Sequence, residues 1–174
     1  MTTTAADHAR GAPPGLDDVG RTGAWNLPVD DGKDAIAFEG KFLGFADSRR
    51  ARHELAGRRP AVHDVVDGKP YARPGERCGA CRWFEVRIFR VGRDEPEHAG
   101  NFVIHYTGAT VVPDEVNRSR VAYADGGHAL IEQAVSRNLE EQRVFITPPM
   151  ARALAMAAKY DADAEHAWVN RAVE

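Results

Sequence analysis

The stretches RWFEVRIFRV (82–91) and NFVIHYTG (101–108) each place large apolar side chains at every second position. These side chains are Phe84, Val86 and Ile88, followed by Phe102, Ile104 and Tyr106. A period of two residues is typical of a β-strand with one buried face. The two stretches therefore predict neighbouring strands, and they decide the class of the fold.

The segment between them, GRDEPEHAG (92–100), is polar and contains proline and two glycines, which favours a hairpin loop. If the loop centres on Pro96, Arg87 lies opposite His105 in the paired strands. Both residues alternate away from the large apolar side chains. We therefore expect Arg87 and His105 to form a polar binding patch on the exposed face of an antiparallel sheet.

Two further stretches extend the predicted sheet. In DAIAFEGKFLGFADS (34–48) the apolar alternation slips by one residue, which predicts a β-bulge near Gly40 or Gly44. SRVAYA (119–124) follows a turn-like segment and supplies the next strand. Together the four stretches predict an antiparallel meander sheet of about four strands.

The C-terminal third changes to a helical period. Asp125 is a candidate N-cap for a helix over 126–138, and Thr147 for a helix over 148–160 that begins with two prolines. Asp161 precedes a last apolar stripe at helical spacing. Strands followed by helices predict an α+β fold, in which two or three C-terminal helices pack on one face of the sheet.

The first 30 residues are rich in Thr, Ala, Gly, Pro and Asp and show no periodicity. We interpret 1–30 as a flexible N-terminal tail with Trp25 as a single anchor, and 31–174 as one α+β domain. A chain of this length can bury a core without disulfide staples.

The composition is ordinary for a water-soluble globular protein, with 43% hydrophobic residues, 28% charged residues and a net charge of −3. The chain shows neither the apolar run of about 7–15 residues of a secretory leader nor a run of about 20 that spans a bilayer. We expect a cytoplasmic protein, of bacterial type from its excess of arginine over lysine, that has no membrane partner.

Cys78 and Cys81 stand two residues apart at the entrance of the strand over 82–91. Zinc in a structural site needs four thiolate, imidazole or carboxylate ligands, and no second C-x-x-C supplies the other two. His53 and His63, in the preceding segment, are the best candidates for them. The sequence thus allows zinc as a cofactor, bound by Cys78, Cys81, His53 and His63.

A redox role for the cysteine pair is the weaker alternative. Catalytic C-x-x-C pairs gain thiolate character from a helix N-terminus that follows them, and here a strand follows. The favoured interpretation assigns no cofactor: one or both cysteines pack inward as small hydrophobic residues.

The segment RRARHELAGRR (49–59) carries five arginines and one glutamate in a chain of negative net charge. Such a loop can neutralise phosphates or dock against an acidic surface. The arginines are Arg49, Arg50, Arg52, Arg58 and Arg59. No aromatic residues are interleaved with them, so the segment by itself does not indicate stacking on single-stranded bases.

No G-x-S-x-G elbow and no phosphate-binding glycine motif occurs in the sequence. The leading hypothesis is a small non-enzymatic binding or regulatory protein that acts through the arginine-rich loop and a sheet face. Its partner is nucleic acid or an acidic protein surface. The alternatives are a zinc-dependent or thiol enzyme centred on Cys78 and Cys81, and an assembly protein that forms homo-oligomers through its tail and the alanine-rich helix.

Overall fold

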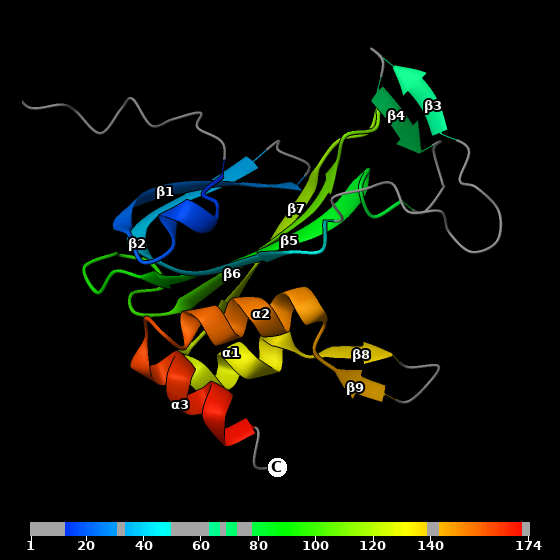
Figure 1. Ribbon diagram of the computed structural model, residues 1–174. Helices are drawn as coiled ribbons and strands as arrows, with labels where there is room; N and C mark the ends of the chain where they lie inside the picture. The colour runs from blue at the N-terminus through cyan, green and yellow to red at the C-terminus, as the bar shows by residue number, and fades with distance from the viewer. Residues whose placement is uncertain are drawn as a thin grey trace, which may run out of the picture.

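The structure is a computed structural model that describes residues 13–30, 34–49, 63–66, 69–72, 78–138 and 143–171. Its centre is a five-stranded antiparallel sheet in the order β1-β2-β5-β6-β7 (Figure 1). The strands are β1 (Thr22–Val29), β2 (Asp34–Asp47), β5 (Arg82–Val91), β6 (Phe102–Thr110) and β7 (Arg118–Ala124). The four predicted strands are all present, and β1 is the fifth.

Three helices follow the sheet in sequence and cover one of its faces (Figure 1). They are α1 (Gly126–Ala134), α2 (Pro148–Ala157) and α3 (Ala162–Arg171). The predicted α+β fold, a meander sheet packed by C-terminal helices, is therefore confirmed. The helix predicted over 126–138 is shorter than expected, since it ends at Ala134 and the chain enters the short strand β8 (Ser136–Asn138).

The sheet face against the helices, here called the helical face, holds the larger core. Val86, Ile88 and Ile104 of the predicted apolar alternation lie in it, packed against Leu130 of α1 and Leu154 of α2. Burying side chains of this size contributes about 1.5–3 kcal/mol each. The apolar face predicted from 82–91 and 101–108 is thus the face that the helices cover, over most of its length.

The opposite face is concave, because the sheet curls until its edge strands β1 and β7 come into contact. A second core fills this concave face, with Leu27, Phe42, Phe89, Val91 and Val103 fully or almost fully buried. The Phe42 and Phe89 rings stack with centroids 4.6 Å apart. The sheet therefore separates two cores, one on each of its faces.

The predicted tail over 1–30 is too long, because residues 22–29 form β1. Trp25 explains why the chain is ordered here: its ring packs against those of Phe42 and Phe89, and its Nε1 donates a hydrogen bond of 2.9 Å to the Gly40 carbonyl. The sequence suggested an anchor at Trp25, and Trp25, Leu27 and Val29 alternate as in a strand, but Pro28 among them weakens this signal and fits an edge strand only. Residues 1–12 lie outside the described part of the chain.

The predicted bulge in the long strand is confirmed, and it falls at Leu43. Phe42 pairs with Phe89 and Gly44 with Ile88, so Leu43 is the extra residue in β2. The bulge shifts the alternation by one residue: Leu43 and Gly44 both face the helices, so that Phe42 before them and Phe45 after them both lie on the concave face. At Gly44 the backbone of α2 comes so close that an added Cβ would lie 2.3 Å from the Ala153 carbonyl oxygen.

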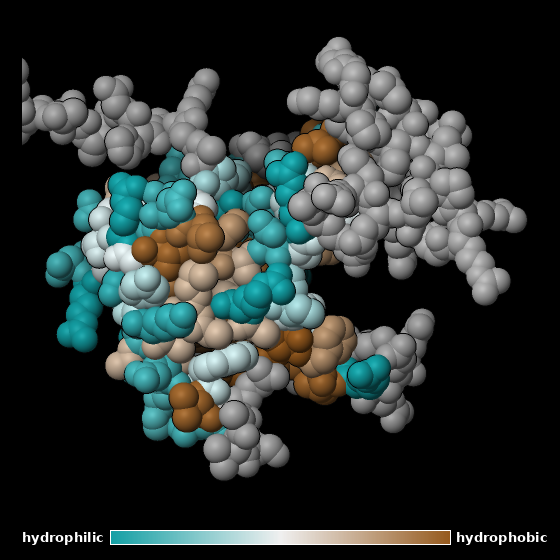
Figure 2. All heavy atoms as spheres, viewed as in Figure 1, coloured by the Kyte–Doolittle hydropathy of each residue, from teal (hydrophilic) through white to brown (hydrophobic). Residues whose placement is uncertain are grey.

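Two short hairpins lie outside the main sheet: β3 (His63–Val66) with β4 (Lys69–Ala72), and β8 with β9 (Arg143–Phe145). Val144 and Phe145 are exposed on β9, where Figure 2 shows apolar side chains at the surface. Asp161 caps α3, since its Oδ1 accepts hydrogen bonds from the backbone N–H of Asp163 and Ala164. Asp125 and Thr147 stand at the predicted N-cap positions of α1 and α2, but their side chains make no capping hydrogen bond. None of the helices among the described residues is long and apolar enough to cross a membrane.

We predict that Gly44→Ala lowers the free energy of unfolding by about 2–3 kcal/mol, because the new methyl group would push α2 away from the sheet. Urea unfolding followed by circular dichroism measures the change. Gly23→Ala, in β1, is the matched control, since an added Cβ there meets no atom within 4 Å. Equal stability of the two variants would contradict the close packing of α2 on β2.

Candidate functional site

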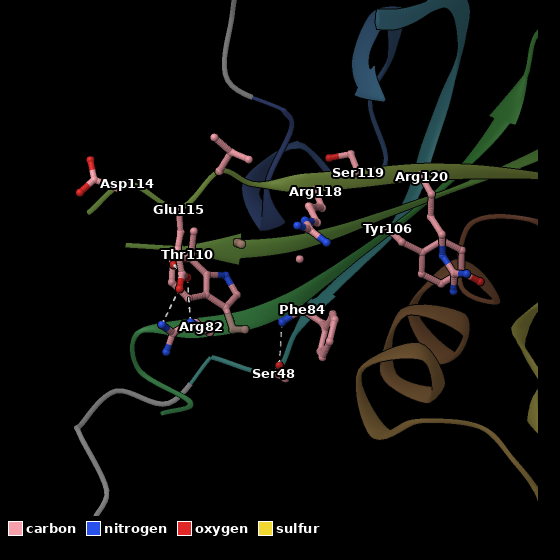
Figure 3. A pocket seen from close by; sticks show the side chains of 14 residues that line it. Ser48, Arg82, Phe84, Tyr106, Thr110, Asp114, Glu115, Arg118, Ser119 and Arg120 are labelled. Atoms are coloured by element: carbon pink, nitrogen blue, oxygen red, sulfur yellow. Dashed lines mark hydrogen bonds and ion pairs between the residues drawn. The ribbon is translucent and has the colours of Figure 1, made fainter. Parts of the chain in front are cut away.

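The helices leave one end of the helical face uncovered, and a cleft of about 800 Å³ lies there (Figure 3). Tyr106 marks the limit of the covered part, because its hydroxyl donates a hydrogen bond of 3.2 Å to the carbonyl oxygen of Gln133 in α1. Beyond Tyr106, strands β5, β6 and β7 continue without any of the described helices over them. The volume is in the range of ligand-binding pockets.

The floor of the cleft is a row of three paired residues, one from each strand. Phe84 of β5 pairs with Gly108 of β6, and Gly108 pairs with Arg118 of β7. The Phe84 side chain is 68% exposed although it is large and apolar. Gly108 has no side chain, so the floor is low between Phe84 and Arg118. A Cβ added at Gly108 would lie 3.9 Å from the Phe84 ring and 3.8 Å from the Arg118 carbonyl oxygen.

One wall of the cleft is fixed by an ion pair between Arg82 and Glu115. The guanidinium donates two hydrogen bonds to the carboxylate, from Nε at 2.8 Å and from Nη2 at 2.6 Å. The Thr110 hydroxyl donates a third, at 3.0 Å. The hydrogen bond with Arg82 lowers the pKa of Glu115 and raises the pKa of Arg82. These bonds hold the loop 111–117 against the strand ends.

The opposite wall is an arginine lying on an aromatic ring. The guanidinium carbon of Arg120 lies 4.4 Å from the centroid of the Tyr106 ring, within the range of a cation–π interaction. Burial raises the pKa of the Tyr106 hydroxyl, and the nearby charge of Arg120 partly opposes this. Tyr106 thus stays neutral and holds Arg120 flat at the edge of the cleft.

The arginine-rich segment begins at this cleft. Ser48 lines it and joins β2 to Phe84 through two hydrogen bonds of 2.9 Å, one to the Phe84 carbonyl oxygen and one from its N–H. Arg49 follows and is exposed, with its guanidinium carbon 4.2 Å from the centroid of the Trp83 ring. Arg50, Arg52, Arg58 and Arg59 lie outside the described residues, so their part in binding stays a prediction.

Cys78 and Cys81 are buried at the entrance of β5, in a small apolar cluster with Ala80 and Val112. Neither cysteine is in a disulfide. The Cys78 carbonyl oxygen accepts hydrogen bonds from the N–H groups of Cys81 and Arg82, which closes a tight turn. The inward packing favoured from the sequence matches this burial.

The zinc site predicted at the cysteine pair stays a prediction. His53 lies outside the described residues, and for His63 only the backbone, in β3, is described. Within the described ranges, no three His, Cys, Asp or Glu residues gather as metal ligands would. Elemental analysis of the wild type and of a Cys78→Ser/Cys81→Ser variant tests the hypothesis: it requires one zinc per chain in the first and none in the second.

Arg87 and His105 pair across β5 and β6, as the hairpin predicted. The expectation that they lie on an exposed face is wrong: Arg87 is 4% exposed and His105 is fully buried. The sheet curls, so that β1 and the segment before it close over this face. The Arg87 guanidinium donates hydrogen bonds to Glu85 at 2.6 Å and to the Pro14 carbonyl at 2.7 Å. Because the Arg87 guanidinium makes its hydrogen bonds inside the protein and His105 is buried, we propose no binding role for this pair.

The His105 imidazole ties β6 to β1, because its Nε2 lies 2.7 Å from the Pro28 carbonyl oxygen and donates to it. Its Nδ1 is buried with no hydrogen-bond partner. Burial lowers the pKa of His105 to about 4, with the hydrogen bond to Pro28 opposing this and the charge of Arg87 adding to it. The ring is therefore neutral in the folded protein at neutral pH.

A histidine with a lowered pKa stabilises the fold above its unfolded pKa of about 6.5, and this contribution is lost as the pH falls toward 4. We predict that the free energy of unfolding drops by about 2 kcal/mol between pH 7 and pH 5 because of His105. Urea unfolding at both pH values measures this drop. His105→Gln keeps a donor for Pro28 without a titrating ring, and its drop should be smaller by that amount; an equal drop in both proteins would contradict the prediction.

A second hollow, of about 370 Å³, lies at the other end of the sheet, by the β5–β6 hairpin loop. Glu95, Glu97 and the stacked rings of His98 and Tyr123 line it. Its charged side chains are acidic, whereas those of the first cleft include three arginines. The two ends of the sheet therefore differ in the sign of charge that they present.

Sequence reasoning missed four residues of the first cleft: Phe84, Gly108, Arg118 and Arg120. Phe84 belongs to the apolar alternation and was expected to be buried with Val86 and Ile88. Gly108 gave the available signal, because a glycine within a strand often marks a place where another group approaches closely. The sequence alone does not say how far along the strands the helices reach.

Comparison of the chain with protein-family models, with curated proteins and with solved structures gave no match. The function therefore has to be argued from the chemistry of the cleft.

Proposed function

We propose that the protein is a small non-enzymatic binding protein that holds an anionic partner in the cleft at the open end of the helical face. The observation that carries this proposal is the cleft lining: Arg82, Arg118 and Arg120 surround the exposed ring of Phe84. An apolar centre with charged groups at its edge is a common composition for binding surfaces.

Charge supports an anionic partner. The cleft has three arginines against two acidic residues, Asp114 and Glu115, in a chain whose net charge is −3. Glu115 pairs with Arg82 and is also influenced by the charge of Arg118. The five charged side chains together leave an excess of one positive charge, on the side of β7 that carries Arg118 and Arg120. Arg49 adds a further exposed cation beside the cleft, where the arginine-rich segment 49–59 begins. A positive surface on an acidic protein can guide a negative ligand to one place.

The polar groups of the cleft favour binding over catalysis. The hydroxyls of Ser48, Tyr106 and Thr110 are all occupied in hydrogen bonds that hold strands, helix or loop in place. No histidine or cysteine is among the described residues that line the cleft. A nucleophile needs an adjacent base, and the carboxylate beside the Thr110 hydroxyl is that of Glu115. The hydrogen bond with Arg82 lowers the pKa of Glu115, which makes this carboxylate a weak base.

The packing of α2 bears on the alternative of self-association. Met150, Ala153, Leu154 and Ala157 form its apolar stripe, and all four are buried within the helical core. The stripe is therefore occupied by the chain's own sheet. An oligomer formed through this helix would have to use its outer face, which makes assembly the less supported function.

We predict that charge reversal at Arg118 and Arg120 weakens binding of polyanions. Arg118→Glu/Arg120→Glu should lose about tenfold or more in affinity at about 50 mM salt, and wild-type binding should itself fall steeply as salt is raised. Fluorescence anisotropy with two labelled probes, oligothymidylate and poly-glutamate, measures both effects.

Arg93→Glu is the matched control, because Arg93 is exposed at the opposite end of β5, by the acidic hollow. It should leave the affinity close to that of the wild type. If neither probe binds, or if reversal at Arg93 has the same effect as reversal at Arg118 and Arg120, the proposed function is wrong.

A further inference from the structure

We infer that the partner held in the cleft is a single-stranded nucleic acid, whose bases stack on Phe84 and Arg120 and whose phosphates face the arginines of β7. This inference rests on the proposed function, since it names the ligand class of the same cleft. It adds to the argument from charge, because it assigns base-stacking roles to the Phe84 ring and to the Arg120 guanidinium.

The first argument is the exposure of Phe84. Its ring is 68% exposed, and it lies over the low floor at Gly108 and outside the cover of the helices. Single-stranded nucleic acids are bound by aromatic rings on sheets because every base has a π-face that can stack. An exposed phenylalanine in an arginine-lined cleft has the composition of such a stacking platform.

The second argument is the geometry of Arg120. Its guanidinium lies on the Tyr106 ring at 4.4 Å, and the side chain is exposed on its other side. Guanidinium planes stack on bases as aromatic rings do. Tyr106 and Phe84 lie on the same face of neighbouring strands, since Tyr106 pairs with Val86 and Gly108 with Phe84. The cleft thus offers two planar groups on one face of the sheet, Phe84 on β5 and Arg120 on β7, placed diagonally across β6.

The third argument is the position of Arg118, which lies in the same row of the sheet as Phe84 and two residues before Arg120 on β7. Arg118 and Arg120 are alternate residues of β7, so their side chains leave the same face about 7 Å apart. The backbone of a strand whose bases lie on Phe84 and Arg120 would then run along β7, next to both guanidinium groups. Charge-assisted bonds from arginine to phosphate oxygens are strong and directional.

A single strand fits better than the alternatives. In a duplex the bases stay stacked on one another, and a protein reads the edges of the base pairs by inserting a helix or a β-ribbon into a groove. This site is a hollow and not an element that projects from the surface. An acidic peptide would use the arginines and leave the ring of Phe84 without a flat partner. The segment 49–59 contains no aromatic residue. At this site the strands β5 and β6 supply aromatic rings, those of Phe84 and Tyr106.

Two variants test the stacking without changing charge. Phe84→Ala removes the ring and should weaken oligothymidylate binding by about tenfold. Gly108→Val fills the floor of the cleft, where an added Cβ meets only ordinary contacts, and should have a similar or larger effect. Labelled oligothymidylate and oligouridylate of about 20 nucleotides are the probes, with poly-glutamate as the polyanion that has no bases.

The controls keep the same residue types at other places. Phe145→Ala removes an exposed ring on β9, and Gly23→Val adds a side chain in β1 where an added Cβ meets no atom within 4 Å. Thermal unfolding of all four variants shows that each retains the wild-type fold. Phe145→Ala and Gly23→Val should bind both oligonucleotides as the wild type does.

The outcomes separate this inference from the proposed function. Loss of oligonucleotide binding in Phe84→Ala, with poly-glutamate binding unchanged, supports a single-stranded nucleic acid. If both probe types depend on Arg118 and Arg120 but neither depends on Phe84, the cleft binds acidic chains by charge alone, and the inference is wrong while the proposed function stands. If Arg118→Glu/Arg120→Glu binds every probe as the wild type does, both are wrong.

Discussion

The bulge at Leu43 is the constraint on which the rest of the structure depends. It lets a 14-residue strand bend, and it shifts the alternation so that Phe42 and Phe45, three residues apart, both pack into the core on the concave face. Immediately after it, Gly44 lets the backbone of α2 lie directly on β2. A regular strand would keep its alternation through this region, and the curl that brings β1 to β7 would lack the bend at its centre.

The curl explains why polar residues of the central strands are buried. Strand β1 and the segment before it, which includes a short 3-10 helix at Leu16–Asp18, close over the concave face, so that this face becomes an interior. Arg87 then donates hydrogen bonds to the Pro14 carbonyl, to Glu85 and to Thr107, and His105 donates one to the Pro28 carbonyl. Buried polar groups are tolerated when they are bonded in this way. The bonds to Pro14 and Pro28 also tie the N-terminal segment and β1 to the strands beneath them.

The cleft follows from the lengths of the elements. Helices α1 and α2 have 9 and 10 residues, which is about 14–15 Å at the helical rise. The strands they cover are longer, since the 10 residues of β5 span about 33 Å. Coverage stops at Tyr106, and Phe84 falls beyond it. A residue from the apolar pattern of the core thus becomes the exposed centre of a site, with Arg118 and Arg120 beside it.

The sequence by itself determined the order of the elements, the hairpin register that sets Arg87 opposite His105, and the bulge in β2, because each depends on local periodicity and turn chemistry. It did not lead to β1, whose short alternation of Trp25, Leu27 and Val29 contains Pro28. The interpretation also gave the wrong exposure for Arg87, His105 and Phe84. Those outcomes depend on which face the curled sheet encloses and where the helices end. Only the tertiary structure decided them, because burial is set by segments far apart in the chain.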